Sequence, residues 1–557
     1  MAPPQVSELI VRYLERLGID TIFGMPGAHI LPVYDSLYDS KIQSVLAKHE
    51  QGAAFMAGGY ARASGKIGAC ITTAGPGATN LVTGIANAYA DKLPVLVITG
   101  EAPTYIFGKG GLQESSGEGG SIDQNELFKG ITKYHKIVER TDYLANVLNR
   151  VTQILLSPNS GPVLLSFPFN VQKEMVDDAI LDTIKTAPAS CSPRDHSKPI
   201  AQLTKLLLEA KSPVLVAGYG CIRSGGQALV SELSESLNVP VITSLKGKGV
   251  ISEQSGLSLG SLGVTSYSPA YRYIAEESDL VVFLGAGFNE RTSYLWDKKL
   301  LTNKKIAQVD INEDQLEKVF KADIAINGDI KDVLSGVLKN LKTCRPLRKN
   351  HEKVRRYLQD VEKQPADNDY AVFKSRFPLV ERFFAKLEAC LPEGTWVFDD
   401  NIIFAQNFYN VSTGNRYFPN TGVSSLGHAI PAAIGARFAE EKSTWAILGD
   451  GGFQMCCMEI MTAVNYGIPL NIVLFNNSTM GLIRKNQTQQ YNKRFINCDF
   501  INPDYAYLAK SFGMQYRHVA SEFDLEALFT NDDLHKAINL IEIPLDKDAF
   551  PNYISKR

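Results

Sequence analysis

The sequence predicts an α/β protein built from three doubly wound domains, each with a parallel sheet. Its 557 residues are too many for a single hydrophobic core. Short apolar runs, typical of buried parallel strands, alternate with helical stretches in three sections of the chain. Polar or proline-containing connectors separate these sections. We therefore expect domains at residues 1–171, 199–343 and 370–557, joined by linkers at 172–198 and 344–369.

The strands of the first domain are apolar runs that end at glycine or polar residues. We expect them at residues 21–24, 68–73 and 93–100, with a helix at 79–90 and the domain's end near Pro168. In the central section the strands are expected at residues 213–218, 239–244, 280–285 and 305–310. In the third section they are expected at residues 395–400, 445–450, 470–477 and 538–543.

The composition is that of a folded globular protein and excludes several classes of function. Apolar residues make up 45% and charged residues 21% of the chain, close to globular averages. The net charge is only −2 and basic residues form no phosphate-binding run, so we expect no nucleic-acid partner. No signal-peptide pattern or long apolar run occurs, so we expect a cytoplasmic protein without a membrane partner. The eight cysteines lack the spacing of a disulfide framework or a zinc site.

A candidate metal and diphosphate site lies at the ends of two strands of the third domain. Asp450 follows one apolar strand, and Asn477 ends the next. Both offer the oxygen ligands that Mg²⁺ takes together with phosphate and water. Gly449, Gly451 and Gly452 let backbone N–H groups approach a diphosphate closely. Gly-Asp-Gly alone is a common turn sequence, so the prediction depends on its spacing from the Asn-Asn pair.

Glu50 is the candidate acid–base residue of the first domain. It follows a strand end and starts a helix rich in small residues. A carboxylate there has two interpretations. It is an ordinary acid at a helix start, stabilised by the helix dipole, or a proton relay held in an apolar site.

Three motifs of the first domain and two of the third resemble those of thiamine-diphosphate (ThDP) enzymes. They are residues 24–32, 49–50 and 74–80, and residues 423–435 and 449–477. The likeness extends over nearly the whole chain, to acetolactate synthases, pyruvate oxidases and benzoylformate decarboxylases, and most to the acetolactate synthase large subunit. It implies a pyrimidine-binding first domain, a Rossmann-like central domain and a diphosphate-binding third domain.

The resemblance assigns roles to individual residues. It implies that Glu50 hydrogen-bonds the cofactor's pyrimidine N1′. It also implies that Asp450, Asn477 and the backbone carbonyl of Thr479 hold Mg²⁺. Leu426 aligns with the residue that props the two cofactor rings, although an apolar residue there is equally explained as core. Further cofactor contacts are implied at Pro26, Gly75, Asn80, Ser424, Gly449, Gly451, Gly452, Met480 and Gly481.

The resemblance also implies the reaction. A small, pyruvate-like 2-oxo acid loses CO₂, and the remaining acyl carbanion is joined to an acceptor carbonyl. The alternative is a non-oxidative decarboxylase that releases an aldehyde. A non-catalytic regulatory paralogue is disfavoured because Glu50, Asp450 and Asn477 are all present. In relatives two subunits enclose each cofactor, so we expect a homodimer as the minimum unit and a homotetramer as the assembly. The sequence does not indicate whether a regulatory subunit exists.

The residues expected around the substrate depart from the acetolactate synthase pattern. Gly27-Ala28-His29 replaces the usual Gly-Gly-Ala, which places an imidazole beside the oxo acid. His29 is then a proton donor or a structural hydrogen-bonding residue. Gln113 is our candidate for the family's active-site glutamine, with Gln124 as the alternative in the glycine-rich segment 109–124.

Two further features leave the substrate and the flavin open. Asn486 stands where biosynthetic acetolactate synthases carry Trp, which puts a branched-chain role in doubt. Arg484 is interpreted either as a carboxylate-binding group or as a surface cation. Glycine turns at 218–221, 246–249 and 285–291 lie where some relatives hold FAD. Similar turns occur in relatives without flavin, so FAD is left open.

Overall fold

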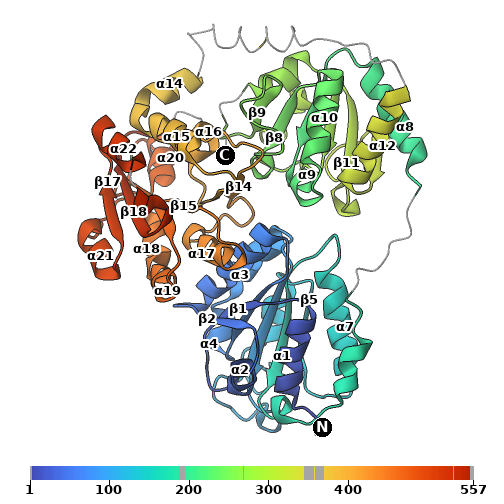
Figure 1. The fold of residues 1–557 in the computed structure, drawn as a ribbon, viewed down its shortest axis with the longest axis vertical. Helices are drawn as coiled ribbons and strands as arrows, with labels where there is room; N and C mark the ends of the chain where they lie inside the picture. The colour runs from blue at the N-terminus through green and yellow to red at the C-terminus, as the bar shows by residue number, and fades with distance from the viewer. Residues whose placement is uncertain are drawn as a thin grey trace.

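The protein contains three six-stranded sheets, each parallel throughout (Figure 1). The computed structural model describes residues 3–186, 195–266, 269–343, 357, 369–530 and 532–551. The predicted fold class is confirmed. Most of the predicted linker 344–369, and residues 187–194 of the linker 172–198, lie outside the described residues. In the described part of the chain, no helix has both the length and the apolar character needed to cross a membrane.

The N-terminal domain has the strand order β2-β1-β3-β4-β6-β5. Its strands are β1 (Thr21–Gly24), β2 (Gln43–Leu46), β3 (Gly68–Thr72), β4 (Val95–Glu101), β5 (Tyr134–Ile137) and β6 (Val163–Pro168). Its helices are α1 (Val6–Arg16), α2 (Leu31–Tyr38), α3 (Glu50–Ser64), α4 (Pro76–Thr79), α5 (Val82–Ala90), α6 (Gln124–Lys129) and α7 (Leu144–Leu155). From β1 the chain continues to β2 on one side, and from β3 it continues to β4 on the other. The place between the ends of β1 and β3 is therefore where an α/β domain binds its ligand.

The central domain has the strand order β9-β8-β7-β10-β11-β12, the dinucleotide-binding arrangement. Its strands are β7 (Pro213–Ala217), β8 (Val241–Ser244), β9 (Ser258–Leu262), β10 (Leu280–Leu284), β11 (Lys305–Asp310) and β12 (Ile324–Asn327). Its helices are α8 (Ser197–Glu209), α9 (Tyr219–Arg223), α10 (Gln227–Leu237), α11 (Ala270–Arg272) and α12 (Ile330–Thr343). The Rossmann-like prediction is therefore confirmed.

The C-terminal domain repeats the topology of the N-terminal domain, with the order β14-β13-β15-β16-β18-β17. Its strands are β13 (Trp396–Asp399), β14 (Arg416–Pro419), β15 (Thr444–Gly449), β16 (Leu470–Asn476), β17 (Gln515–His518) and β18 (Ile538–Pro544). Its helices are α14 (Asp369–Arg376), α15 (Pro378–Cys390), α16 (Ile403–Phe408), α17 (Ala429–Ala439), α18 (Asp450–Cys456), α19 (Ile460–Asn465), α20 (Gly481–Gln490), α21 (Tyr505–Phe512) and α22 (Glu522–Phe529). The place where the chain changes direction across the sheet lies between β13 and β15.

Helices α3 and α17 join these two domains (Figure 1). They follow equivalent strands, β2 and β14, and meet where both carry small residues. A Cβ atom on Gly59 would overlap the carbonyl oxygen of Ala432, and one on Gly435 would overlap that of Met56. One continuous hydrophobic cluster includes side chains of both domains. The two helices therefore pack backbone against backbone.

We expect Gly59→Ala to destabilise the protein, because the added methyl group has no room against the backbone of α17. The expected loss is about 1–3 kcal/mol of unfolding free energy, the usual cost of overpacking. The measurement is thermal or denaturant unfolding of the purified chain.

Gly58→Ala is the matched control on the same helix. A Cβ on Gly58 would meet Leu93 Cδ1 at 3.6 Å, an ordinary contact. Alanine is the better helix former, so this variant should gain about 0.5–1 kcal/mol. Equal stability of the two variants would contradict the tight crossing.

Candidate active site

The predicted metal ligands follow adjacent strands. Strand β15 pairs with β16, and Asp450 is the first residue of α18. The Asp450 side chain is buried, and its Oδ2 accepts hydrogen bonds from the backbone N–H groups of Ser478 (2.6 Å) and Asn477 (3.2 Å). Burial raises the pKa of Asp450. The structure thus brings the two predicted ligand segments together, as expected from parallel strand ends.

The turn after β16 is held by local hydrogen bonds. Ser478 has a left-handed backbone, with φ 54°. Asn477 Oδ1 accepts a hydrogen bond from the N–H of Thr479 at 3.3 Å, and Thr479 Oγ1 donates to the carbonyl of Cys498 at 2.9 Å. The Asn502 amide, which the sequence did not suggest, donates to Asp450 Oδ2 at 2.9 Å. A carboxylate, an amide oxygen and a peptide carbonyl are a donor set suited to Mg²⁺.

A second loop, after β13, lies beside the glycines of this motif. Asp400 is buried, and its carboxylate accepts hydrogen bonds from the N–H groups of Gly427 (2.7 Å) and Ala429 (2.9 Å). It therefore fixes the turn that carries Leu426. A Cβ on Gly452 would lie 3.2 Å from Asp400 Oδ2. The sequence placed Asp400 in the predicted strand 395–400 and did not assign it to the site, whereas β13 ends at Asp399.

This loop and the turn between β14 and α17 each carry a polar atom that has no partner among the described residues. Asn401 has φ 64°, and its Oδ1 is buried without a hydrogen bond. Ser425 Oγ is buried and unpaired in the same way. A Cβ on Gly451 would lie 2.6 Å from Met480 Sδ, so a larger residue would crowd this turn. Unpaired buried polar atoms call for a partner. The Ser425 hydroxyl can donate to a phosphate oxygen, and with the oxygen ligands of the Asp450 loop the residues present fit a diphosphate with Mg²⁺.

Glu50 begins α3, as the sequence predicts. Its Oε2 accepts a hydrogen bond from Asn80 Nδ2 at 2.9 Å, which brings two predicted site residues together. The backbone before it is held by Glu459, which the sequence did not suggest. Glu459 Oε1 accepts from the N–H groups of Lys48 (3.0 Å) and His49 (2.8 Å). The segment between α18 and α19, which carries Glu459, therefore contacts the start of α3 within one chain.

The residues predicted to surround the substrate lie near the ends of the adjacent strands β1 and β3. His29 Nδ1 lies 3.3 Å from Gln113 Oε1, and Thr73 Oγ1 donates to the same oxygen at 3.4 Å. Gly27 packs against Thr73, and Gly75 packs against Gln113. Ala28 and Pro26 are exposed in the same turn.

Gln124, the alternative glutamine, lies elsewhere. It starts α6, is buried, and donates to Thr99 Oγ1 at 2.9 Å. Of the two candidates, Gln113 is therefore the one beside His29.

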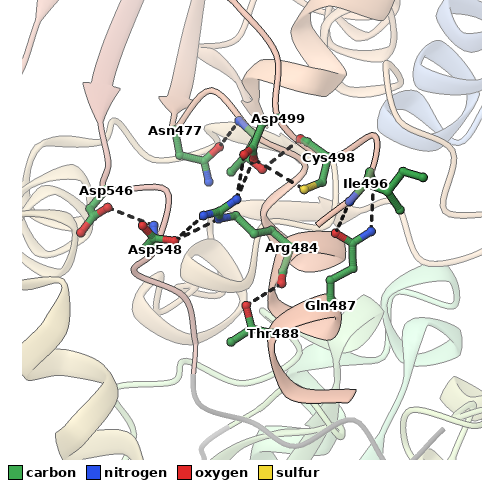
Figure 2. Close-up of polar contacts among 10 residues, drawn as sticks. Asn477, Arg484, Gln487, Thr488, Ile496, Cys498, Asp499, Asp546 and Asp548 are labelled. Atoms are coloured by element: carbon green, nitrogen blue, oxygen red, sulfur yellow. Dashed lines mark hydrogen bonds and ion pairs between the residues drawn. The ribbon is translucent and has the colours of Figure 1, made fainter. Parts of the chain in front are cut away.

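Arg484 is neither exposed nor free (Figure 2). Its side chain is only 6% exposed and forms ion pairs with Asp499 (2.7 Å) and Asp548 (2.6 Å). Its guanidinium also stacks 3.8 Å from the centre of the Phe495 ring. The surface-cation interpretation was therefore wrong. Two carboxylates already share its charge, so the structure gives no support for a role in binding substrate.

A cavity of about 230 Å³ lies at the switch point of the central domain. Its lining includes Gly220 and Gly285 from the predicted glycine turns. It also includes Arg62, Asp91 and Lys246, and Asp91 forms ion pairs with both cations. The volume is below the roughly 300–1,000 Å³ usual for cofactor-sized ligands. The structure therefore gives no support for FAD.

Comparison with known proteins agrees with this geometry. The N-terminal binding domain of the thiamine pyrophosphate enzymes matches residues 4–125, the central domain residues 200–337, and the C-terminal binding domain residues 401–543. The chain belongs to the thiamine pyrophosphate enzyme family. Thiamine pyrophosphate is the same compound as ThDP. The matched N-terminal binding domain includes Glu50, and the matched C-terminal binding domain includes Asp450 and Asn477.

The relatives of this ThDP enzyme include several acetolactate synthases. The chain is 33% identical to a probable acetolactate synthase large subunit of Methanococcus aeolicus, over 96% of this chain and 90% of that protein. It is 31% identical to the acetolactate synthase large subunits of Corynebacterium glutamicum, over 98% and 87%, and of Lactococcus lactis subsp. lactis, over 92% and 88%. The protein is thus a ThDP enzyme similar to acetolactate synthases.

Proposed function

We propose that this enzyme uses ThDP and Mg²⁺ to decarboxylate a small, pyruvate-like 2-oxo acid and to join the remaining fragment to an acceptor carbonyl. The observation that carries the proposal is that the residues for binding both ends of the cofactor are present and correctly grouped. Asp450 and Asn477 lie together at adjacent strand ends, and Glu50 starts α3 with Asn80 on its carboxylate. Identity to acetolactate synthases over nearly the full chain supports the same activity.

The residues of the protein divide the work between binding and proton transfer. Bound ThDP supplies the electron sink for loss of CO₂. Glu50 would hold a proton at the pyrimidine N1′, and Asn80 orients its carboxylate. Asp450, Asn477 and the Thr479 carbonyl would hold Mg²⁺. The glycines beside Asp450 would let backbone N–H groups reach the diphosphate.

Further contacts would shape the cofactor and substrate positions. Asp400 holds the turn that places Leu426 where it would pack against the cofactor rings. Ser424, Met480 and Gly481 lie in the adjoining loops as further candidate contacts. On the substrate side, His29 would donate or accept a proton, and the Gln113 amide would hydrogen-bond the oxo acid or the acceptor.

A second copy of the chain would complete the site. Several apolar side chains of the metal-binding region are exposed in the single chain, among them Met455 (60%), Met458 (57%) and Ile483 (47%). These side chains are candidates for burial against a second copy of the chain. We propose a homodimer in which the Glu50 of one subunit and the Asp450 of the other serve one cofactor, with pairing of dimers into a homotetramer.

The product formed from pyruvate tests this function. With ThDP and Mg²⁺ we expect CO₂ release accompanied by acetolactate, analysed by chromatography. Free acetaldehyde as the sole product would instead establish the decarboxylase alternative. Absence of CO₂ release from every 2-oxo acid in a broad panel would overturn both reactions.

A further inference from the structure

We propose that Glu101 is a positioning residue for the substrate side of the site. Through Ser115 it fixes the loop segment that places Gln113 against His29. The proposal depends on the function proposed above. It extends that function by naming a buried group that the reaction does not otherwise use.

The geometry begins at the end of β4. Glu101 is fully buried, and its Oε1 accepts hydrogen bonds from the N–H groups of Ala102 (2.7 Å) and Ser115 (2.9 Å). Ser115 Oγ in turn accepts from the N–H of Gly75 at 3.2 Å. The Ser115 carbonyl accepts from the N–H of Gln124 at 3.1 Å. Ser115 is therefore tied to three separate segments of the N-terminal domain.

Gln113 lies two residues before this anchor. Its backbone is left-handed, with φ 56°, a conformation that costs energy in a residue other than glycine. Such a conformation persists only where the surrounding structure enforces it. The Ser115 anchor supplies part of that constraint, so the Gln113 amide stays 3.3 Å from His29 Nδ1.

The buried carboxyl group itself is costly for folding. Burial raises the pKa of Glu101 to about 7. Its Oε2 has no hydrogen-bond partner within the described part of the chain. Burying a carboxyl group with only one of its two oxygens hydrogen-bonded costs folding free energy. The bonds that it accepts from the backbone of the loop are its contribution.

A second carboxylate holds the outer part of the same loop. Glu114 accepts hydrogen bonds from the N–H groups of Gly108 (2.6 Å) and Gly111 (2.9 Å). Its side chain therefore organises the glycine-rich turn, whereas Glu101 attaches the loop to the sheet. Loss of Glu101 should release the segment around Ser115 while the outer turn remains folded.

The test compares Glu101→Ala, Glu101→Gln and Glu118→Gln in the full-length enzyme with ThDP and Mg²⁺. Glutamine keeps one acceptor oxygen for Ser115, and alanine keeps none. Glu118 is an exposed acid of the same loop and serves as the control. The readouts are hydrogen–deuterium exchange of residues 108–123 and the separate values of kcat and KM for the 2-oxo acid.

We expect Glu101→Ala to speed exchange around Ser115 and to lower kcat/KM by about 10²-fold, the effect of misplacing a site group by about 1 Å. Glu101→Gln should restore slow exchange and most of kcat/KM, and Glu118→Gln should match the wild type. Unchanged exchange in Glu101→Ala, or a glutamine variant as impaired as the alanine variant, would overturn the proposal. A wild type without any 2-oxo acid activity would refute the proposed function alone, because exchange still tests the Ser115 anchor.

Discussion

Replacing Glu50 with glutamine is expected to lower kcat by about 10²–10⁴-fold, the usual contribution of a positioned acid–base group. Glutamine has the size of glutamate and can still accept the hydrogen bond from Asn80. It cannot exchange a proton with the pyrimidine N1′, so the effect should fall on kcat. The measurement is CO₂ release from the 2-oxo acid at saturating ThDP and Mg²⁺.

The same substitution at another helix start is the matched control. Glu522 is exposed in the first turn of α22, far from the site in the sequence. Glu522→Gln removes an acid from a helix start and an exposed ion pair with Arg382. It should cost only about 0.3–1 kcal/mol of stability, without loss of turnover. If Glu50→Gln behaved in the same way, Glu50 would be an ordinary helix-start acid.

Replacing Asp450 with asparagine is expected to lower the affinity for Mg²⁺ by more than about 100-fold, beyond the effect of losing an outer ligand partner. The change removes the charged ligand and keeps an oxygen for the N–H groups of Asn477 and Ser478. Activity measured against Mg²⁺ concentration at fixed ThDP gives the affinity.

Asp504→Asn supplies the control for this second variant. Asp504 caps α21 by accepting the N–H groups of Ala506 and Tyr507. Asparagine caps helices equally well, so this variant should bind Mg²⁺ like the wild type. Normal Mg²⁺ dependence of Asp450→Asn would place the metal elsewhere.

Mixing the two variants, at a Mg²⁺ concentration too low to support Asp450→Asn, tests whether the site is shared between subunits. A heterodimer of Glu50→Gln and Asp450→Asn chains would contain one site with both groups intact. Random exchange of dimers should restore about one quarter of the wild-type activity. If both groups of a site came from one chain, mixing would restore nothing.

The sequence predicted the central strands and the metal loop because these depend on local patterns. Strands β15 and β16 are continuous apolar runs, and polar residues mark their ends. The edge strands β5 and β17 were not predicted, because their side chains are partly exposed and form no such run. The interior strand β6 was not predicted as a strand either, although it is a buried apolar run. Between Asp450 and Asn477 the chain forms α18, a short 3-10 turn and α19.

The supporting residues of the site could not be found from the sequence. Glu459 contacts residues more than 400 positions earlier in the chain, and Glu101 ends an apolar strand that reads as core. The environment of Arg484 was left open because one of its two partners, Asp548, lies 64 positions later. The choice between Gln113 and Gln124 needed the folded loop, since the extra residues there obscure the correspondence with relatives.

The glycine contact between α3 and α17 also determines which parts of the subunit can move. Hinge and shear motions need side chains that can slide or repack at the domain boundary. Where Gly59 and Gly435 meet backbone directly, no such layer exists. The two cofactor-binding domains of each chain should therefore travel as a single body, and a site shared between subunits would open through surface loops or through rotation of one subunit against the other.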